Sequence, residues 1–129
     1  MTQSGPTIEN IIREYLESKE KSIVYGKKRL DSEKEYNRLL TKYDGEAKHY
    51  SLDQADLIYK TYREMIANGQ ESELAQARFT EAEEKLREVG QILFEATINA
   101  RISMPLSNGE ISESRSVTVS YNNGQPVVS

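Results

Sequence analysis

The N-terminal third of the chain repeats a pattern of positions spaced three, four and seven residues apart. These positions are Ile12, Leu16, Ile23, Leu30, Asn37 and Leu40. Such spacing makes a narrow seam, as in a coiled coil, rather than the broad apolar face of a globular helix. The pattern predicts a long helix over residues 8–43, roughly 54 Å in length. Gly26 lies in its interior, where glycine costs about 1 kcal/mol relative to alanine, so a bend is expected there.

A second helix is predicted over residues 52–68. Ser51 and Gln54 form a capping box, in which each side chain satisfies a free backbone N–H of the other residue. One apolar face follows, made by Ala55, Ile58, Tyr59, Tyr62, Met65 and Ile66. Asn68-Gly69 has the character of a helix end and Ser72 that of a new start. We therefore expect a break here, and one continuous helix is the alternative.

The clearest periodicity predicts a third helix over residues 73–103. Its seam positions alternate strictly by four and three: Ala75, Phe79, Ala82, Leu86, Val89, Leu93, Ala96 and Ala100. From Val89 onward, apolar residues leave this single face, which predicts cover on several sides. A second copy of the chain is one such cover, because two-fold dimers are the commonest assembly. We assign self-association to Leu93, Phe94, Ile98 and Ile102.

Residues 105–129 differ from everything before them. The segment RSVTVSY alternates with the period of a strand, and Asn122-Asn123-Gly124 leads to QPVV as in a hairpin. Pro126 restricts the last segment to a sheet edge. An isolated hairpin is marginal in water, so these strands need a surface to rest on. We expect Val117, Val119 and Tyr121 to meet protein, as a clip on the chain's own helices, in a dimer or with a partner.

The predicted fold class is all-α: an elongated antiparallel helical bundle or coiled-coil-like helical hairpin, with a short C-terminal β-hairpin. The predicted domains are a helical domain over 1–104 and a β-type tail over 105–129. In architecture alone, this layout is similar to small coiled-coil chaperones such as prefoldin subunits.

Composition narrows the possible functions. The 129 residues are 36% hydrophobic and 29% charged, with a net charge of −4 and a mean hydropathy of −0.72. This acidic balance makes nucleic-acid binding an unfavoured function, because nucleic-acid binders usually carry a basic excess. The lack of cysteine excludes disulfides and cysteine-ligated zinc. No apolar run reaches the roughly 18 residues of a membrane helix, and no secretory signal begins the chain, so a cytoplasmic protein is expected.

Residues with catalytic potential are few. His49 is the single histidine, and it cannot build a multi-histidine metal site. Glu81, Glu84 and Glu88 share one helical face, as in magnesium sites of all-α nucleotide hydrolases, but such sites need acidic residues from a facing helix. The basic cluster Lys27–Arg29 is followed at once by acidic residues. We therefore expect no enzyme and no cofactor.

The expected function is a non-enzymatic helical scaffold, adaptor or assembly protein, bacterial or viral. It would act through self-association and through a protein partner. Eight tyrosines support this expectation, since tyrosine is enriched at protein interfaces. The alternatives are a small magnesium-dependent nucleotide hydrolase and a coiled-coil-type chaperone.

Overall fold

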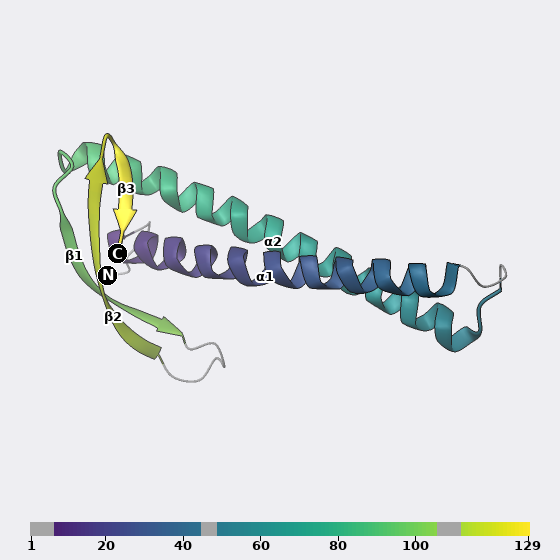
Figure 1. The fold of residues 1–129 in the computed structure, drawn as a ribbon. Helices are drawn as coiled ribbons and strands as arrows, with labels where there is room; N and C mark the ends of the chain where they lie inside the picture. Colours follow the sequence, from purple (N-terminus) through teal and green to yellow (C-terminus); the bar gives the residue numbers. More distant parts are fainter. Residues whose placement is uncertain (1–6, 45–48, 106–111) are drawn as a thin grey trace. The chain divides into compact units, whose positions relative to one another are not determined.

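The computed structural model describes residues 7–44, 49–105 and 112–129. Helices α1 (Ile8–Asp44) and α2 (Leu52–Ile92) are long and pack against each other. Strands β1 (Ile98–Pro105), β2 (Ser112–Asn122) and β3 (Gln125–Val128) follow and form one antiparallel sheet (Figure 1). The all-α prediction is confirmed in part: the chain is mostly helical, but its C-terminal part is a three-stranded sheet rather than a short hairpin alone. Its bundle or coiled-coil character stays a prediction.

The chain divides into two compact units. Unit 1 comprises residues 1–19 and 77–129, and unit 2 comprises residues 20–76. Each unit therefore contains a segment of both helices, and unit 1 also contains the sheet. The expected domain boundary between residues 104 and 105 falls inside β1. The division into a helical domain and a tail stays a prediction.

Helix α1 agrees with the predicted span of 8–43. Thr7 caps it, since the Thr7 hydroxyl accepts from the N–H of Asn10 at 3.2 Å and its carbonyl accepts from the N–H of Ile11. The helix continues without interruption through Gly26. One neighbour of this glycine is the Ser72 hydroxyl, 3.8 Å from where a Cβ would lie. Two small residues thus face each other between the helices of unit 2.

The predicted break at Asn68-Gly69 is wrong, because α2 is one helix over 41 residues. The residues interpreted as caps instead contact α1. The Asn68 amide donates to the Ser32 hydroxyl at 3.0 Å, and a Cβ on Gly69 would lie 3.3 Å from the Arg29 side chain. Interhelical contact therefore explains the polar and glycine residues here. The predicted capping box at the start of α2 is confirmed, with Ser51–Gln54 bonds of 3.0 and 3.1 Å.

The predicted third helix over 73–103 is also wrong in its last part, because α2 ends at Ile92. Phe94 and Glu95 adopt positive φ angles of 54° and 57°. The Glu95 N–H donates to the Gly90 carbonyl at 2.6 Å, and the Phe94 N–H donates to the Gln91 carbonyl at 3.4 Å. These two bonds make a Schellman turn, which satisfies the free carbonyls at the helix end. The chain then turns into β1.

The sheet has the order β1-β2-β3, with Ile98 opposite Val119 and Val119 opposite Val128. Asn123 and Gly124 connect β2 to β3 with φ angles of 54° and 81°. Two successive positive φ angles are the signature of a type I′ hairpin turn. The predicted hairpin is confirmed. Its two strands belong to a three-stranded sheet, because β1 pairs with β2. Residues 98–103 of β1 lie in the segment that was predicted to be the end of the third helix.

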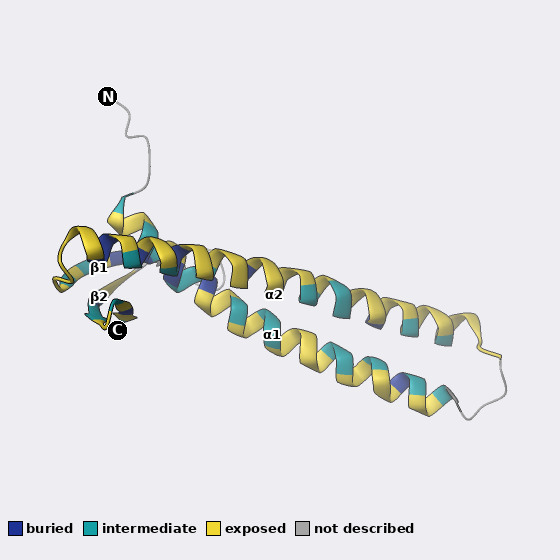
Figure 2. Cartoon of the chain, turned by 90° about the horizontal axis from the view of Figure 1, so that it is seen from above, coloured by how far each residue is buried: buried dark blue, intermediate teal, exposed yellow. Residues whose placement is uncertain are grey.

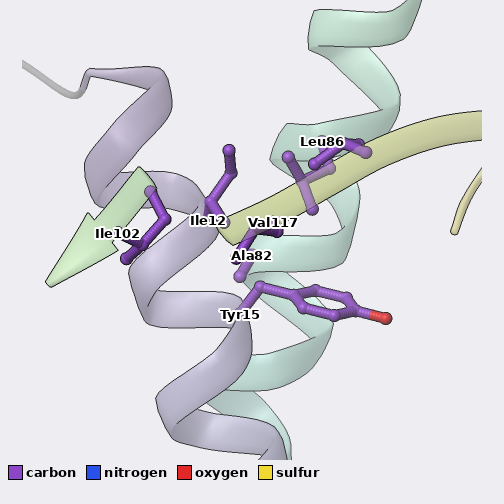
Figure 3. Packing of buried hydrophobic residues seen from close by; sticks show 7 residues of the cluster. Ile12, Tyr15, Ala82, Leu86, Ile102 and Val117 are labelled. Carbon is purple, nitrogen blue, oxygen red and sulfur yellow. The ribbon is translucent and has the colours of Figure 1, made fainter. Parts of the chain in front are cut away.

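The hydrophobic core of unit 1 joins both helices to one face of the sheet (Figure 3). Its buried members are Ile12, Tyr15, Ala82, Leu86, Ile102, Val117 and Val119. Phe79 packs against this cluster, and its ring centroid lies 4.8 Å from that of Tyr15. Residues coloured as buried are gathered in this part of the chain (Figure 2). The predicted seam is therefore confirmed at Leu86 and Phe79.

Unit 2 buries far fewer large side chains. Leu39 is its one large hydrophobic residue that is buried among the described residues, and Ala75 and Ser72 supply small buried contacts. The ring centroids of Tyr36 and Tyr62 lie 5.5 Å apart across the two helices. Unit 2 therefore depends on partly exposed aromatic contacts for much of its packing.

Tyr15 and Tyr121 should ionise at a higher pH than is usual for a tyrosine side chain. Burial raises the pKa of Tyr15, with a smaller contribution from the charge of Glu83, and burial also raises the pKa of Tyr121. Both phenols favour the neutral form in the folded chain, so the unfolded chain loses these protons first. Stability should be unaffected by these groups below pH 10 and should fall as the pH rises above it.

An alkaline titration that follows tyrosinate absorbance checks this expectation. The Tyr15→Phe and Tyr121→Phe variants should each lose amplitude from the late part of the curve. Loss of amplitude from the early part of the curve in both variants would contradict the burial of these two phenols.

Candidate functional site

The strand residues predicted to meet a partner are packed against other residues of unit 1. Val117 and Val119 are buried in the core cluster. The Tyr121 ring lies against Gly90, and its hydroxyl donates to the Leu86 carbonyl at 2.7 Å. The expectation that protein covers these side chains is confirmed, and the cover is the chain's own helices. Direct partner binding through them stays a prediction, and it would require their displacement from the core.

The residues predicted for self-association separate into two groups. Ile102 is fully buried in the core and Ile98 packs against it, so both are used within the chain. Leu93 is 37% exposed and Phe94 is 93% exposed, both in the turn after α2. Ile92 beside them is also exposed. A self-association role for Leu93 and Phe94 stays a prediction.

The polar clusters found in the sequence lie on exposed helix surfaces. Glu81, Glu84 and Glu88 are exposed on α2, and Glu81 pairs with Lys85 at 3.3 Å. Within residues 7–44, 49–105 and 112–129, no group of three or more His, Asp or Glu side chains is placed to hold a metal ion. In the basic cluster, Lys28 lies 5.0 Å from the centre of the Tyr25 ring, and the Arg29 guanidinium pairs with Glu33. These charged side chains contact residues on their own helix.

A hollow of about 370 Å³ lies between the helices of unit 2, near the end where α1 and α2 are joined. We call it the tyrosine groove. Its lining residues are Tyr36, Leu40, Tyr50, Ala55, Ile58, Tyr59 and Tyr62. Helix α1 supplies two of them one turn apart, and α2 supplies four along a single face. The four α2 residues belong to the apolar face predicted for residues 52–68, and Leu40 belongs to the predicted seam of the first helix, whereas Tyr36 does not.

The groove combines aromatic rings with hydroxyl groups and has no charged lining residue. Tyr36 and Tyr62 contact each other with ring planes tilted by 53°. Tyr59 is 66% exposed, and Tyr50 and Tyr62 are also exposed. Such rings offer apolar area at a low cost in conformational entropy, while each phenol can donate and accept a hydrogen bond. This chemistry suits recognition of a protein segment rather than of a charged small molecule.

A larger hollow of about 430 Å³ lies along the same two helices. Tyr36 lines both hollows, but the larger one also contains Arg29, Glu33 and Glu73. The Arg29–Glu33 ion pair at 3.5 Å already lies in it. Because an occupant would have to displace or accommodate these charges, the uncharged tyrosine groove is the stronger candidate site.

Sequence analysis recognised the tyrosines as an interface signal but did not place them together. They were distributed over two predicted helices, and periodicity does not show which faces of two helices meet. The spacing of Tyr59 and Tyr62 on α2, and of Tyr36 and Leu40 on α1, was the available signal. The structure adds the pairing of these two faces.

Comparison with known proteins identifies no relative: no family model matches the chain, and neither a curated protein nor a solved structure matches it. Over the described residues, neither helix has a stretch that is both long and apolar enough to span a membrane.

Proposed function

We propose that this protein is a non-enzymatic scaffold, adaptor or assembly protein that acts through self-association and through a protein partner. The partner site is the tyrosine groove of unit 2. Its occupant is an apolar segment of another protein, held against the tyrosine rings and hydrogen-bonded by their hydroxyls.

The observation that supports this proposal is the exposure of large aromatic side chains around an uncharged hollow. Exposed apolar surface is unfavourable in water, and contiguous patches of it commonly mark interaction sites. Tyr50, Tyr59 and Tyr62 are exposed around the groove. Leu57 is a further exposed apolar residue on α2, the helix that carries Tyr59 and Tyr62. Tyrosine is also among the residues that most often dominate binding energy at protein interfaces.

Truncation of Tyr59 should weaken partner capture with little effect on folding. Because this side chain is largely exposed, Tyr59→Ala removes groove surface without opening a core cavity. Loss of one dominant interface tyrosine costs about 2 kcal/mol or more, so affinity should fall at least about tenfold. Affinity capture with quantitative mass spectrometry would identify proteins retained by the parent chain and lost with Tyr59→Ala. Calorimetry with the purified partner would then measure the dissociation constant.

Ile23→Ala is the matched control. Ile23 is 65% exposed, lies on α1 in the same unit and does not line the groove. The proposal requires a partner whose dissociation constant rises with Tyr59→Ala and is unchanged by Ile23→Ala. A partner that both variants bind as tightly as the parent chain would contradict the assignment of the groove.

A further inference from the structure

Two Asn-Gly pairs within the described residues have opposite surroundings. Asn68-Gly69 lies inside helix α2, and Asn123-Gly124 forms the turn between β2 and β3. Asparagine followed by glycine is the pair most prone to lose its side-chain amide, because glycine has no Cβ to hinder attack by its own backbone nitrogen. The surroundings of each pair therefore decide whether it reacts.

The pair in α2 is held in place. The Gly69 N–H belongs to the helical ladder, in which it donates to a carbonyl of the preceding turn. The Asn68 amide donates to the Ser32 hydroxyl at 3.0 Å, and the Arg29 side chain lies against Gly69. Attack of the Gly69 nitrogen on the Asn68 side chain would require the helix to open locally.

The pair in the β2–β3 turn is open. Asn123 is exposed, and beyond the chain neighbours of Gly124 no heavy atom lies within 4 Å of the position that a Cβ on this glycine would take. The hydrogen bonds that close such a turn use the flanking residues Asn122 and Gln125, so the ladder does not need the Gly124 N–H. This nitrogen is free to react, and the surrounding space can hold the ring that forms.

We propose that Asn123 is a site of spontaneous deamidation, and that its isoaspartyl product loosens β3 from the sheet of unit 1. The reaction needs only water and a solvent base. It involves neither the tyrosine groove nor self-association, so it goes beyond the proposed function and is tested separately from it.

The chemistry proceeds in two steps. The Gly124 backbone nitrogen loses its proton to solvent and attacks Cγ of Asn123, which forms a new C–N bond. The bond from Cγ to the side-chain nitrogen breaks, and ammonia leaves with a proton from water, which gives a succinimide ring. Water then opens either carbonyl of the ring. One opening gives aspartate, and the other gives isoaspartate, whose main chain runs through the former side chain.

The isoaspartyl product should loosen β3 because it inserts a methylene into the main chain of the turn, and the turn fixes the register of a hairpin. Thr118 and Ser129 exchange both backbone hydrogen bonds at 2.9 Å. Ser120 and Val127 face each other two residues further along, so they are the next hydrogen-bonded pair. A longer turn moves Val127 out of this pairing. The aspartyl product keeps the backbone unchanged, and aspartate, like asparagine, tolerates a positive φ.

Ageing of the purified chain at mildly alkaline pH tests the site. Peptide mapping by mass spectrometry should show Asn123 converted to aspartate and isoaspartate at least about tenfold faster than Asn68, because Asn68 reacts only after local opening of α2. The rate at Asn123 should rise with pH, since the attacking nitrogen must first lose its proton. Equal rates at the two asparagines, or no conversion of Asn123, would overturn the proposal.

Asn123→Gly is the matched control. It keeps the turn, because glycine also adopts a positive φ, and it has no amide to lose. Asn123→Asp, measured without ageing, separates the new charge from the extra methylene. The Val127 amide should exchange with solvent faster in the isoaspartyl fraction of the aged parent chain than in aged Asn123→Gly or fresh Asn123→Asp. Equally slow exchange in all three proteins would overturn the loosening of β3, as would equally fast exchange in fresh Asn123→Asp.

Discussion

Leu86→Ala is expected to lower the free energy of unfolding by about 2–5 kcal/mol. Leu86 is fully buried where α2 meets α1 and the sheet, with Ile12, Val117 and Val119 in the same cluster (Figure 3). Truncation there loses apolar burial and leaves a cavity between three elements. Urea unfolding followed by circular dichroism would measure the change.

Leu93→Ala provides the comparison from the same helical repeat. Sequence periodicity assigns Leu86 and Leu93 equal roles, and it predicts a similar loss of 2–5 kcal/mol for both. The structure places Leu93 after the end of α2, where it is partly exposed, so its truncation should cost less than about 1 kcal/mol. Equal losses of unfolding free energy with Leu86→Ala and Leu93→Ala would contradict the end of α2 at Ile92.

Gly90→Ala should destabilise the protein by about 1–3 kcal/mol, although alanine is the better helix former. A Cβ at Gly90 would lie 2.5 Å from Cε1 of the Tyr121 ring. The ring would have to move, and its hydrogen bond to the Leu86 carbonyl would be strained or lost. Helical propensity alone predicts the opposite result, a gain of about 1 kcal/mol.

Gly26→Ala is the matched control for this prediction. Its added Cβ would lie 3.8 Å from the Ser72 hydroxyl, an ordinary contact, so the substitution should be neutral or stabilising. In a Tyr121→Ala background, Gly90→Ala should lose most of its effect, because the ring that it strikes is gone. An undiminished effect in that background would show that another contact opposes the substitution.

Local signals in the sequence were sufficient for several elements. Thr7 and the seam predicted α1 to within about one residue, Ser51 and Gln54 marked the start of α2, and Asn123-Gly124 marked the β2–β3 turn. Pro126 indicated an edge strand, and β3 is one. Each of these features depends on residues that are close in the sequence.

The predictions were wrong at positions whose secondary structure is set by tertiary contacts. Asn68 and Gly69 have the sequence character of a helix end, but Asn68 bonds Ser32 and Gly69 admits the Arg29 side chain between the helices. Residues 98–103 fit two periods at once. Ala100 continues a seam of threes and fours, while Ile98, Ala100 and Ile102 also alternate as a strand. Because these residues pair with β2, they form a strand.

The candidate surfaces were only partly predictable for the same reason. The abundance of tyrosine indicated an interface, yet the groove exists only because Tyr36 on α1 meets Tyr62 on α2. The strand character of β2 was evident, but its pairing with residues 98–105 was not. Sequence alternation also could not show that Val117 and Val119 face the chain's own helices.

The central claim is that the C-terminal sheet is built into unit 1, where Val117 and Val119 are buried in its core cluster. Residue-resolved amide hydrogen exchange along β2 tests it most directly. The amides of Val117 and Val119 should exchange slowly because they bond to β1. Exchange of both amides at the rate of an unfolded peptide would contradict the account.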